Sequence, residues 1–415
     1  MTFAEELQWR GLIKDTTLSD IAWLNEPKTF YLGADAGSAD SLTVGNLAVF
    51  MTARRLLDAG WKTVLLMGGA TSLIGDPGGK DSERELVSPE TITKNIDGVA
   101  TQVKKLFAGK DFTLVNNYDW FKGLGYLEFL RDIGKHYSMT ELLQRDYIVD
   151  RIGEGGNGIS YAEFSYSLIQ GYDFWHLYKN HAVVLQIGGS DQWGNMLSGV
   201  PLIRKRESAE AHALSIPLII NKTTGKKFGK SEDGAVWLSQ AKTSVFKFYQ
   251  FWLNSGDAYS VDYLKIFTLL SPERINELEL EMQQNPSSRT VQKQLAYEIT
   301  ALIHGTERAE SVKRVSEVLF GGANYTTLSQ SDFEVLKGEL KTVTVGEGDD
   351  LIDILISAEL AQSKTEARRF LQESAIYING SQFSLDKTTI TADDSIHGFV
   401  VLKRGKNATA LLQMH

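Results

Sequence analysis

The sequence predicts an α/β fold in which a parallel β-sheet domain is followed by a helical region and a small α+β unit. Up to about residue 220, short apolar runs typical of buried strands alternate with amphipathic helical patterns. From about residue 235 to 325 the pattern is helical throughout. Strands separated by helices favour a parallel sheet with right-handed crossovers, so the first part of the chain is predicted to be Rossmann-like.

The elements of the predicted sheet domain follow from their residue patterns. The expected strands are residues 30–35, 62–69, 112–117, 182–189 and 215–220. Apolar residues recur at a spacing of three to four in 46–61 and 91–107, as in amphipathic helices. Residues 118–181 are too many and too helical for one connection, so we interpret part of them as an insertion. Ligands bind such sheets at the carboxyl ends of the strands, which here carry the glycine-rich sequences LGAD, MGGAT and QIGGSD.

The residue patterns in the rest of the chain predict two further domains. Residues 244–255 and 288–305 have helical patterns, and the polar, glycine-containing sequence at 342–350 is interpreted as a linker. Beyond it, the pattern predicts two short helices and then two strands, AIYING and GFVVLKRG. The predicted domains are residues 1–230, with an insertion at about 118–160, residues 231–340 and residues 348–415.

Composition excludes several classes of site. The 415 residues carry a formal net charge of −9, so any site for a polyanion must be a local patch. The absence of cysteine excludes disulfides, thiolate metal sites and cysteine nucleophiles. No apolar run approaches the roughly 20 residues that span a bilayer, and the acidic N-terminal segment does not resemble a signal peptide. We therefore expect a cytoplasmic protein without a membrane partner.

Residues 67–84, MGGATSLIGDPGGKDSER, form the first candidate site. Glycine-rich turns after a strand allow backbone N–H groups to approach a phosphate or another polar ligand. Asp76 could hold a cation or an amine, and Lys80 and Arg84 follow on the same loop. A plain turn before a helix would use the same residue types, so this segment alone does not decide between the two interpretations.

Residues 163–174, EFSYSLIQGYDF, form the second candidate. Tyr166, Gln170 and Asp173 are spaced at i, i+4 and i+7, which places them on one stripe of a helix. Such a stripe is often the solvent face, but the flanking aromatic residues favour a pocket. A buried carboxylate needs a partner, and a phenol or an ammonium group would serve.

Two further segments complete the set. LQIGGSDQWGN (185–195) carries Asp191 and Gln192, which either cap a helix or bind a ligand where two glycines permit close approach. GKKFGKSEDGAVWL (225–238) brings Lys227 and Lys230 onto a loop that could close on a polyphosphate, although it could also be a solvated turn. Together the four segments indicate one nucleotide site at the edge of the sheet.

The order of these motifs resembles bacterial-type tyrosyl-tRNA synthetase, a class I enzyme. The matching sequences are YLGADAGSADSLTVGNL, GGATSLIGDPGGK, FSYSLIQGYDF, LQIGGSDQWGN and KFGKSEDGAVWL. KFGKS resembles the class I lysine signature KMSKS. The resemblance runs from about residue 5 to the end and implies activation of L-tyrosine by ATP with Mg²⁺. Tyrosyl-adenylate and pyrophosphate would form, and the tyrosyl group would pass to the terminal adenosine of tRNA(Tyr) without a covalent enzyme intermediate.

The resemblance also implies roles for individual residues. Tyr31 and Asp173 match the residues that bind the phenolic hydroxyl. The ammonium group and substrate backbone would be held by Asp76, Tyr166, Gln170 and Gln192. The expected ATP contacts are Gly33, Asp35, Ser38, Gly45, Gly189, Asp191, Lys227 and Lys230. The expected catalytic residues are Thr43, Asn46, Lys80, Arg84, Lys227 and Lys230.

One position departs from the family pattern. The other class I signature, HIGH or HIGN, here reads Thr43-Val44-Gly45-Asn46. The missing histidine normally hydrogen-bonds the phosphate in the transition state, and loss of one such donor costs about 2–4 kcal/mol when nothing compensates. A threonine hydroxyl can still donate, and Ser38 could share this work.

The remaining regions have counterparts as well. The insertion matches a segment of the family's dimer interface, which implies a homodimer. The helical region matches the anticodon-side domain. The C-terminal unit resembles a small RNA-binding module. That unit is not basic overall, because residues 349–415 contain 7 Lys and Arg against 9 Asp and Glu. The seven histidines, among them His176 and His181, fall outside every motif, and we expect packing or surface roles for them and no metal site.

Three alternatives stay open from the sequence. A catalytically weak relative retained for RNA binding would explain Thr43, but it would not need the residues of a pyrophosphate clamp. A tryptophan-specific sister enzyme would share the fold, although Tyr31 with Asp173 suits a phenol better than an indole. An unrelated nucleotidyltransferase would not explain the two C-terminal regions.

Overall fold

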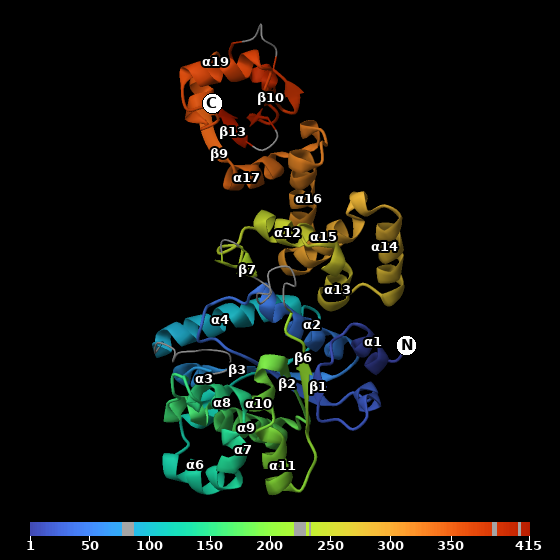
Figure 1. Cartoon of the computed structure of the whole chain (residues 1–415), viewed down its shortest axis with the longest axis vertical. Coiled ribbons are helices and arrows are strands. Elements are labelled where there is room, and N and C mark those ends of the chain that lie inside the picture. The colour runs from blue at the N-terminus through green and yellow to red at the C-terminus, as the bar shows by residue number, and fades with distance from the viewer. Residues whose placement is uncertain (77–86, 220–229, 232–233, 384–387, 406–407) are drawn as a thin grey trace. The chain divides into compact units, whose positions relative to one another are not determined.

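The computed structural model describes residues 1–76, 87–219, 230–231, 234–383, 388–405 and 408–415 (Figure 1). The chain divides into two compact units. The first comprises Met1–Thr243 and Ser255–Leu295, and the second comprises Ser244–Asn254 and Ala296–His415.

The first unit is built on a six-stranded sheet of order β1-β6-β5-β2-β3-β4. Its strands are β1 (Asp15–Thr16), β2 (Thr29–Ala34), β3 (Lys62–Met67), β4 (Thr113–Asn116), β5 (Leu185–Gly189) and β6 (His212–Ile216). All neighbours are parallel except β1, which pairs antiparallel with β6. The predicted parallel sheet with helical crossovers is confirmed.

One predicted strand is shifted. β6 was expected at 215–220 but ends at Ile216, because Pro217 has no N–H to donate to a neighbouring strand. Residues 217–219 belong to no regular element, and residue 220 lies outside the described residues. The strand instead begins three residues early, at His212, and pairs with β5 from Leu185 onward.

Helices cover both faces of this sheet. The longer helices around the sheet are α2 (Val44–Asp58), α4 (Pro89–Leu106), α9 (Tyr161–His181) and α11 (Gly199–Glu207). The shorter ones are α1 (Phe3–Trp9), α3 (Gly69–Ile74), α5 (Tyr118–Phe121), α6 (Tyr126–Asp132), α7 (Met139–Leu143), α8 (Asp146–Ile152) and α10 (Trp193–Met196). Figure 1 shows α2 and α4 on one face and α9, α10 and α11 on the other. The unit also contains α13 (Asp257–Phe267) and α14 (Pro272–Gln284), and α15 (Thr290–His304) begins in it.

The strand order determines where a ligand binds. From β2 the chain proceeds to β3 and β4 on one side, and it then returns to β5 and β6 on the other side of β2. The side on which successive strands are added therefore switches between β2 and β5, although these two strands are parallel. Open parallel sheets bind ligands in the crevice at the carboxyl ends of the strands at such a point. The exits of β2 and β5 are the sequences LGAD and QIGGSD.

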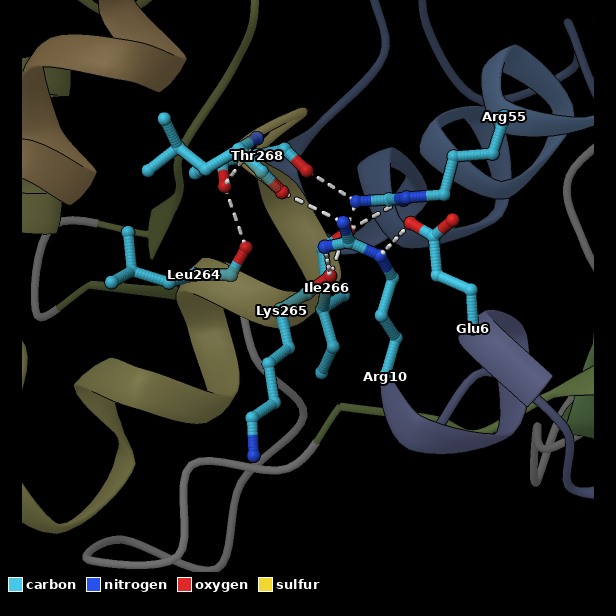
Figure 2. Close-up of polar contacts among 8 residues, drawn as sticks. Glu6, Arg10, Arg55, Leu264, Lys265, Ile266 and Thr268 are labelled. Carbon is cyan, nitrogen blue, oxygen red and sulfur yellow. Dashed lines mark hydrogen bonds and ion pairs between the residues drawn. The ribbon is translucent and has the colours of Figure 1, made fainter. Parts of the chain in front are cut away.

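Two buried arginines attach α13 to α1 and α2 (Figure 2). The guanidinium groups of Arg10 and Arg55 donate hydrogen bonds to backbone carbonyls at and just beyond the C-terminal end of α13. The acceptors belong to Lys265, Ile266, Thr268 and Leu270. Glu6 pairs with Arg10 at 2.7 Å, and burial beside the Arg10 charge lowers the pKa of Arg55 to about 9. The last carbonyls of a helix lack partners within the helix, and cations there also favour its dipole, so this cluster holds α13 against α2.

The second unit combines helices with a five-stranded sheet of order β11-β10-β12-β13-β9. Its helices are α12 (Val245–Leu253), the end of α15, α16 (Thr306–Phe320), α17 (Gln330–Glu339), α18 (Leu351–Ser357) and α19 (Lys364–Gln372). Its strands are β9 (Lys341–Val345), β10 (Ile376–Ile378), β11 (Ser381–Gln382), β12 (Phe399–Arg404) and β13 (Ala408–Met414). The predicted pair of short helices followed by strands is confirmed.

The linker predicted at 342–350 is wrong for its first half. Lys341–Val345 forms β9, which pairs parallel with β13. The sequence TVTV consists of β-branched residues that suit a half-buried strand, and the glycines and aspartates after it obscured this pattern. Among the described residues, no helix is long and apolar enough to cross a membrane.

Candidate active site

The buried side of the site lies between β2 and α9. Tyr31 on β2 is buried, and its ring centroid lies 5.3 Å from that of Phe174 on α9. Its hydroxyl has no hydrogen-bond partner among the described residues. Burial, with the Asp173 carboxylate as the next contribution, raises the pKa of Tyr31 well above its usual value. Buried hydroxyls are normally paired, so this one indicates a place for a polar ligand.

Asp173 on α9 is a second buried polar group of this region. Its two carboxylate oxygens accept hydrogen bonds from Asn117 Nδ2 at 3.1 Å and from Trp120 Nε1 at 2.9 Å. Burial raises the pKa of Asp173 to about 7, although both hydrogen bonds act in the opposite direction. A carboxylate that is held by two donors and titrates near neutral pH is suited to accept a further hydrogen bond from a phenol.

Asn117 and Trp120 are the two donors to Asp173, and the sequence motifs did not reveal either of them. Asn117 follows β4 directly, and its side chain is fixed by accepting from Ala70 N at 2.6 Å and donating to Thr71 Oγ1 at 3.2 Å. Trp120 lies in the short helix α5. The signal that could have found Asn117 is its position at the carboxyl end of a strand in a parallel sheet.

Asp76 lies in a second polar cluster. It follows α3 through Gly75, whose φ of 88° is strained for residues with a side chain. Its carboxylate accepts from Gln192 Nε2 at 2.5 Å and from Asn195 Nδ2 at 3.3 Å, and Asn195 also donates to Gln192 Oε1. The structure thus brings the predicted residues Asp76 and Gln192 together around a carboxylate that could bind an ammonium group.

The exits of β2 and β5 each carry a glycine. A Cβ atom on Gly33 would meet nothing within 4 Å, so its backbone is open, whereas one on Gly189 would lie 2.5 Å from Asp191 Oδ1, so a side chain there would clash. Asp35 is exposed and accepts from the hydroxyls of Ser72 at 2.9 Å and Ser38 at 3.3 Å. Gly33 and Asp35 thus lie exposed at the carboxyl end of β2, and Asp191 lies exposed beyond β5.

The variant signature occupies the N-terminus of α2, and the half-buried Gly45 lies within its first turn. Both the backbone N–H and the hydroxyl of Thr43 donate to Asn46 Oδ1 at 3.0 Å. Val44 N donates to Val236 O at 3.0 Å, so the start of α2 contacts the segment that follows the lysine loop. A helix N-terminus attracts anions through its free N–H groups and its dipole.

The other predicted residues are placed as follows. Tyr166 is buried and Gln170 half-buried on α9, on the same helix as Asp173. Lys80, Arg84 and Lys227 lie outside the described residues, and of Lys230 only the backbone, in the short strand β7 (Lys230–Ser231), is described. Among the described residues, no cluster of three or more His, Cys, Asp or Glu side chains could hold a metal ion.

Comparisons with known proteins agree with this geometry. Residues 24–321 match the family of tRNA synthetases class I (W and Y), and residues 332–412 match the tyrosine–tRNA ligase SYY-like C-terminal domain. Fold and site together define a class I aminoacyl-tRNA synthetase. The tyrosine–tRNA ligases of Bacillus caldotenax and Lactococcus lactis subsp. lactis are each 43% identical to the chain, covering 100% and 99% of it and all of each relative. The chain belongs to the tyrosine–tRNA ligase family.

A solved structure supports the same assignment. The C-terminally truncated mitochondrial tyrosyl-tRNA synthetase of Aspergillus nidulans is similar with a TM-score of 0.69 and 33% identity, over 77% of this chain and 94% of that one. Family membership excludes the unrelated nucleotidyltransferase that the sequence left open. Full-length similarity to tyrosine–tRNA ligases also disfavours the tryptophan-specific alternative.

Proposed function

We propose that this tyrosine–tRNA ligase selects its substrate with Tyr31 and Asp173 and activates it with ATP at the carboxyl ends of β2 and β5. The substrate carboxylate attacks the α-phosphate, a bond to phosphorus forms, pyrophosphate leaves, and tyrosyl-adenylate results. The terminal adenosine of tRNA(Tyr) then attacks the activated carbonyl and releases AMP. This proposal is carried by the buried Asp173 carboxylate together with the Tyr31 hydroxyl, which has no hydrogen-bond partner in the described part of the chain.

The remaining roles are those that the family resemblance implies, and we propose them for this chain. Asp76, Gln192, Tyr166 and Gln170 would hold the ammonium group and the backbone of the amino acid. Gly33, Asp35, Ser38, Gly45, Gly189 and Asp191 would contact ATP, and Lys80, Arg84, Lys227 and Lys230 would neutralise its phosphates during the reaction. Mg²⁺ would enter as part of the ATP complex, since this ion keeps several waters and binds mainly through substrate phosphates. We also propose a cytoplasmic location, where tRNA is charged.

The affinity for tyrosine should rise with pH between about 6 and 7. The pKa of Asp173 is raised to about 7 in the free protein, and the ionised form is the better acceptor for a phenol. Below that pKa, binding must first release a proton, which costs up to about tenfold in affinity per pH unit. Because this carboxyl ionises near 3.8 in the unfolded chain, it also lowers folding stability as pH rises from about 4 to 7.

Equilibrium titration with tyrosine at several pH values would measure this effect. Asp173→Ala is the control, because it should bind tyrosine more weakly and without that pH dependence. An affinity of the unmodified protein that stays constant from pH 6 to 8 would contradict the proposed role of Asp173.

Thr43→His should raise the rate of tyrosyl-adenylate formation by about tenfold or more and change the dissociation constant of tyrosine less than twofold. The hydroxyl of Thr43 is directed to Asn46, whereas an imidazole reaches further and supplies a new donor for the phosphate. One such donor is worth about 10²-fold in other enzymes. Single-turnover measurement of adenylate formation would test this, and an unchanged rate would show that the position is already compensated.

We propose that the chain forms a homodimer through the insertion. Its helices α5 to α8 carry large apolar side chains that are exposed in the described chain, and such surfaces mark interaction sites. They are Tyr118, Tyr126, Leu127, Leu130, Met139, Leu143, Val149 and Ile152. Leu127 has the largest exposed fraction among them, 78%, and is therefore the residue to test.

Leu127→Asp should therefore weaken the dimer by about 30-fold or more, because an interface anchor is worth at least about 2 kcal/mol. Sedimentation over a range of concentrations would measure the dissociation constant. Leu280→Asp on α14 provides a matched control, because Leu280 is 57% exposed but lies outside the insertion. Equal effects of the two substitutions, or none from Leu127→Asp, would reject this interface.

We further propose that residues 1–230 act as the catalytic domain, with the helical residues 231–340 on the anticodon side and residues 348–415 as an RNA-binding module. The match of residues 332–412 to the C-terminal domain of tyrosine–tRNA ligases supports the last of these roles.

A further inference from the structure

Trp120 is held by two side chains that lie one turn apart on α9. Its indole Nε1 donates to Asp173 Oδ1 at 2.9 Å. Its ring is stacked on the imidazole of His176, with centroids 4.3 Å apart and an interplanar angle of 19°. Asp173 and His176 are three residues apart, a spacing that places them on the same face of the helix.

The two donors to Asp173 are anchored differently. Asn117 is fixed by its hydrogen bonds to the first turn of α3. Trp120 lies in α5, a helix of only four residues, so its backbone alone constrains the indole less. The contact with the flat face of the indole comes from His176, whose own ring centroid lies 6.1 Å from that of Tyr172.

We propose that His176 is a positioning residue for substrate recognition. Its ring holds the Trp120 indole in the plane that keeps Nε1–H on Asp173, and the carboxylate thereby stays oriented toward the phenol of tyrosine. This inference rests on the proposed role of Asp173 in binding that phenol. His176 itself acts on the substrate only through Trp120.

Loss of the His176 ring should affect the binding of tyrosine more than the turnover rate. An aromatic pair contributes about 0.5–1.5 kcal/mol beyond the area it buries, which corresponds to roughly 2- to 12-fold in affinity. His176→Leu fills a similar volume without a planar ring. It should raise the KM for tyrosine by about 3- to 10-fold, leave kcat within about twofold, and lower the preference for tyrosine over phenylalanine by the same factor as KM.

Tyrosine-dependent ATP–pyrophosphate exchange by the full-length protein tests this with five variants: His176→Leu, three further single variants, and the double variant that combines His176→Leu with Trp120→Phe. His176→Phe keeps a stacked ring and should restore the KM. His181→Ala, at the end of the same helix, is the matched control and should behave as the unmodified protein. Trp120→Phe keeps the ring but removes the N–H, so it should reproduce the loss seen with His176→Leu. The double variant should lose no more than either single one, because His176 acts through that N–H.

Thermal unfolding shows whether each variant is folded. If His176→Leu does not fold, His176→Phe and Trp120→Phe are compared in its place. Two results would overturn the inference: an unchanged KM in His176→Leu, or losses that multiply in the double variant. Asp173→Ala in the same assay separates this failure from that of the proposed function. If Asp173→Ala loses the preference for tyrosine while His176→Leu keeps it, only the positioning role is wrong. If Asp173→Ala keeps it, the proposed phenol site is wrong, and the role of His176 is rejected with it.

Discussion

Asp173→Ala should abolish the preference for tyrosine over phenylalanine. Tyrosyl-tRNA synthetases as a family reject phenylalanine by about 10⁵ without editing, and that family value is the reference for the expected loss. The preference arises because buried polar groups stay unpaired when the substrate lacks its hydroxyl. Without the carboxylate, the ratio of kcat/KM for the two amino acids should approach 1 to 10, mainly because tyrosine reacts more slowly.

The ratio of kcat/KM values in ATP–pyrophosphate exchange measures this directly. Asp332→Ala is a matched control, because Asp332 is equally buried and hydrogen-bonded to Ser311 and Arg314, but lies in the second unit. It should lower stability and keep the preference. A preference that survives in Asp173→Ala would contradict the phenol assignment.

Asp76→Asn should lower kcat/KM for tyrosine by about 200- to 5,000-fold. The carboxylate of Asp76 accepts hydrogen bonds from the amides of Gln192 and Asn195 and brings a negative charge to this cluster. Breaking a partly buried charge pair by removing one partner costs about 3–5 kcal/mol when the other charge stays buried. The asparagine keeps the volume but cannot compensate the substrate ammonium group.

The effect of Asp76→Asn on specificity differs from that of Asp173→Ala. Phenylalanine carries the same ammonium group, so Asp76→Asn should slow both substrates and keep their ratio. Asp97→Asn, an exposed position on α4, is the control for a surface charge. Full activity of Asp76→Asn, or loss of the tyrosine preference in it, would show that Asp76 does not hold the ammonium end.

The fold was predictable where local pattern determines structure. The parallel strands and their crossovers followed from apolar runs and helical spacing. β6 was shifted because Pro217 ends a run that continues as apolar sequence, and β9 was missed because its threonines resemble a polar linker. Pro217 is visible in the segment itself, whereas the pairing of β9 with β13 is not, and that pairing determines the boundary of β9.

The main residues of the candidate site were predictable from motifs, but the residues that hydrogen-bond to them were not. The segments around Asp76, Asp173 and Gln192 are recognisable by residue type and spacing. Asn117 and Trp120 donate hydrogen bonds to Asp173 although they lie 56 and 53 residues before it in the sequence. These contacts exist only after α9 packs near the carboxyl end of β4. The same holds for Arg55, whose acceptors lie more than 200 residues further along the chain.

The most direct test of the central claim is ATP–pyrophosphate exchange by the purified protein with tyrosine, phenylalanine or tryptophan as the only amino acid. The buried Tyr31 and Asp173 site, with Thr43 in the signature, predicts exchange with tyrosine alone. Exchange with tryptophan or phenylalanine at a comparable rate would contradict the phenol site. No exchange from folded protein would contradict tyrosine activation itself and would favour a relative retained for RNA binding.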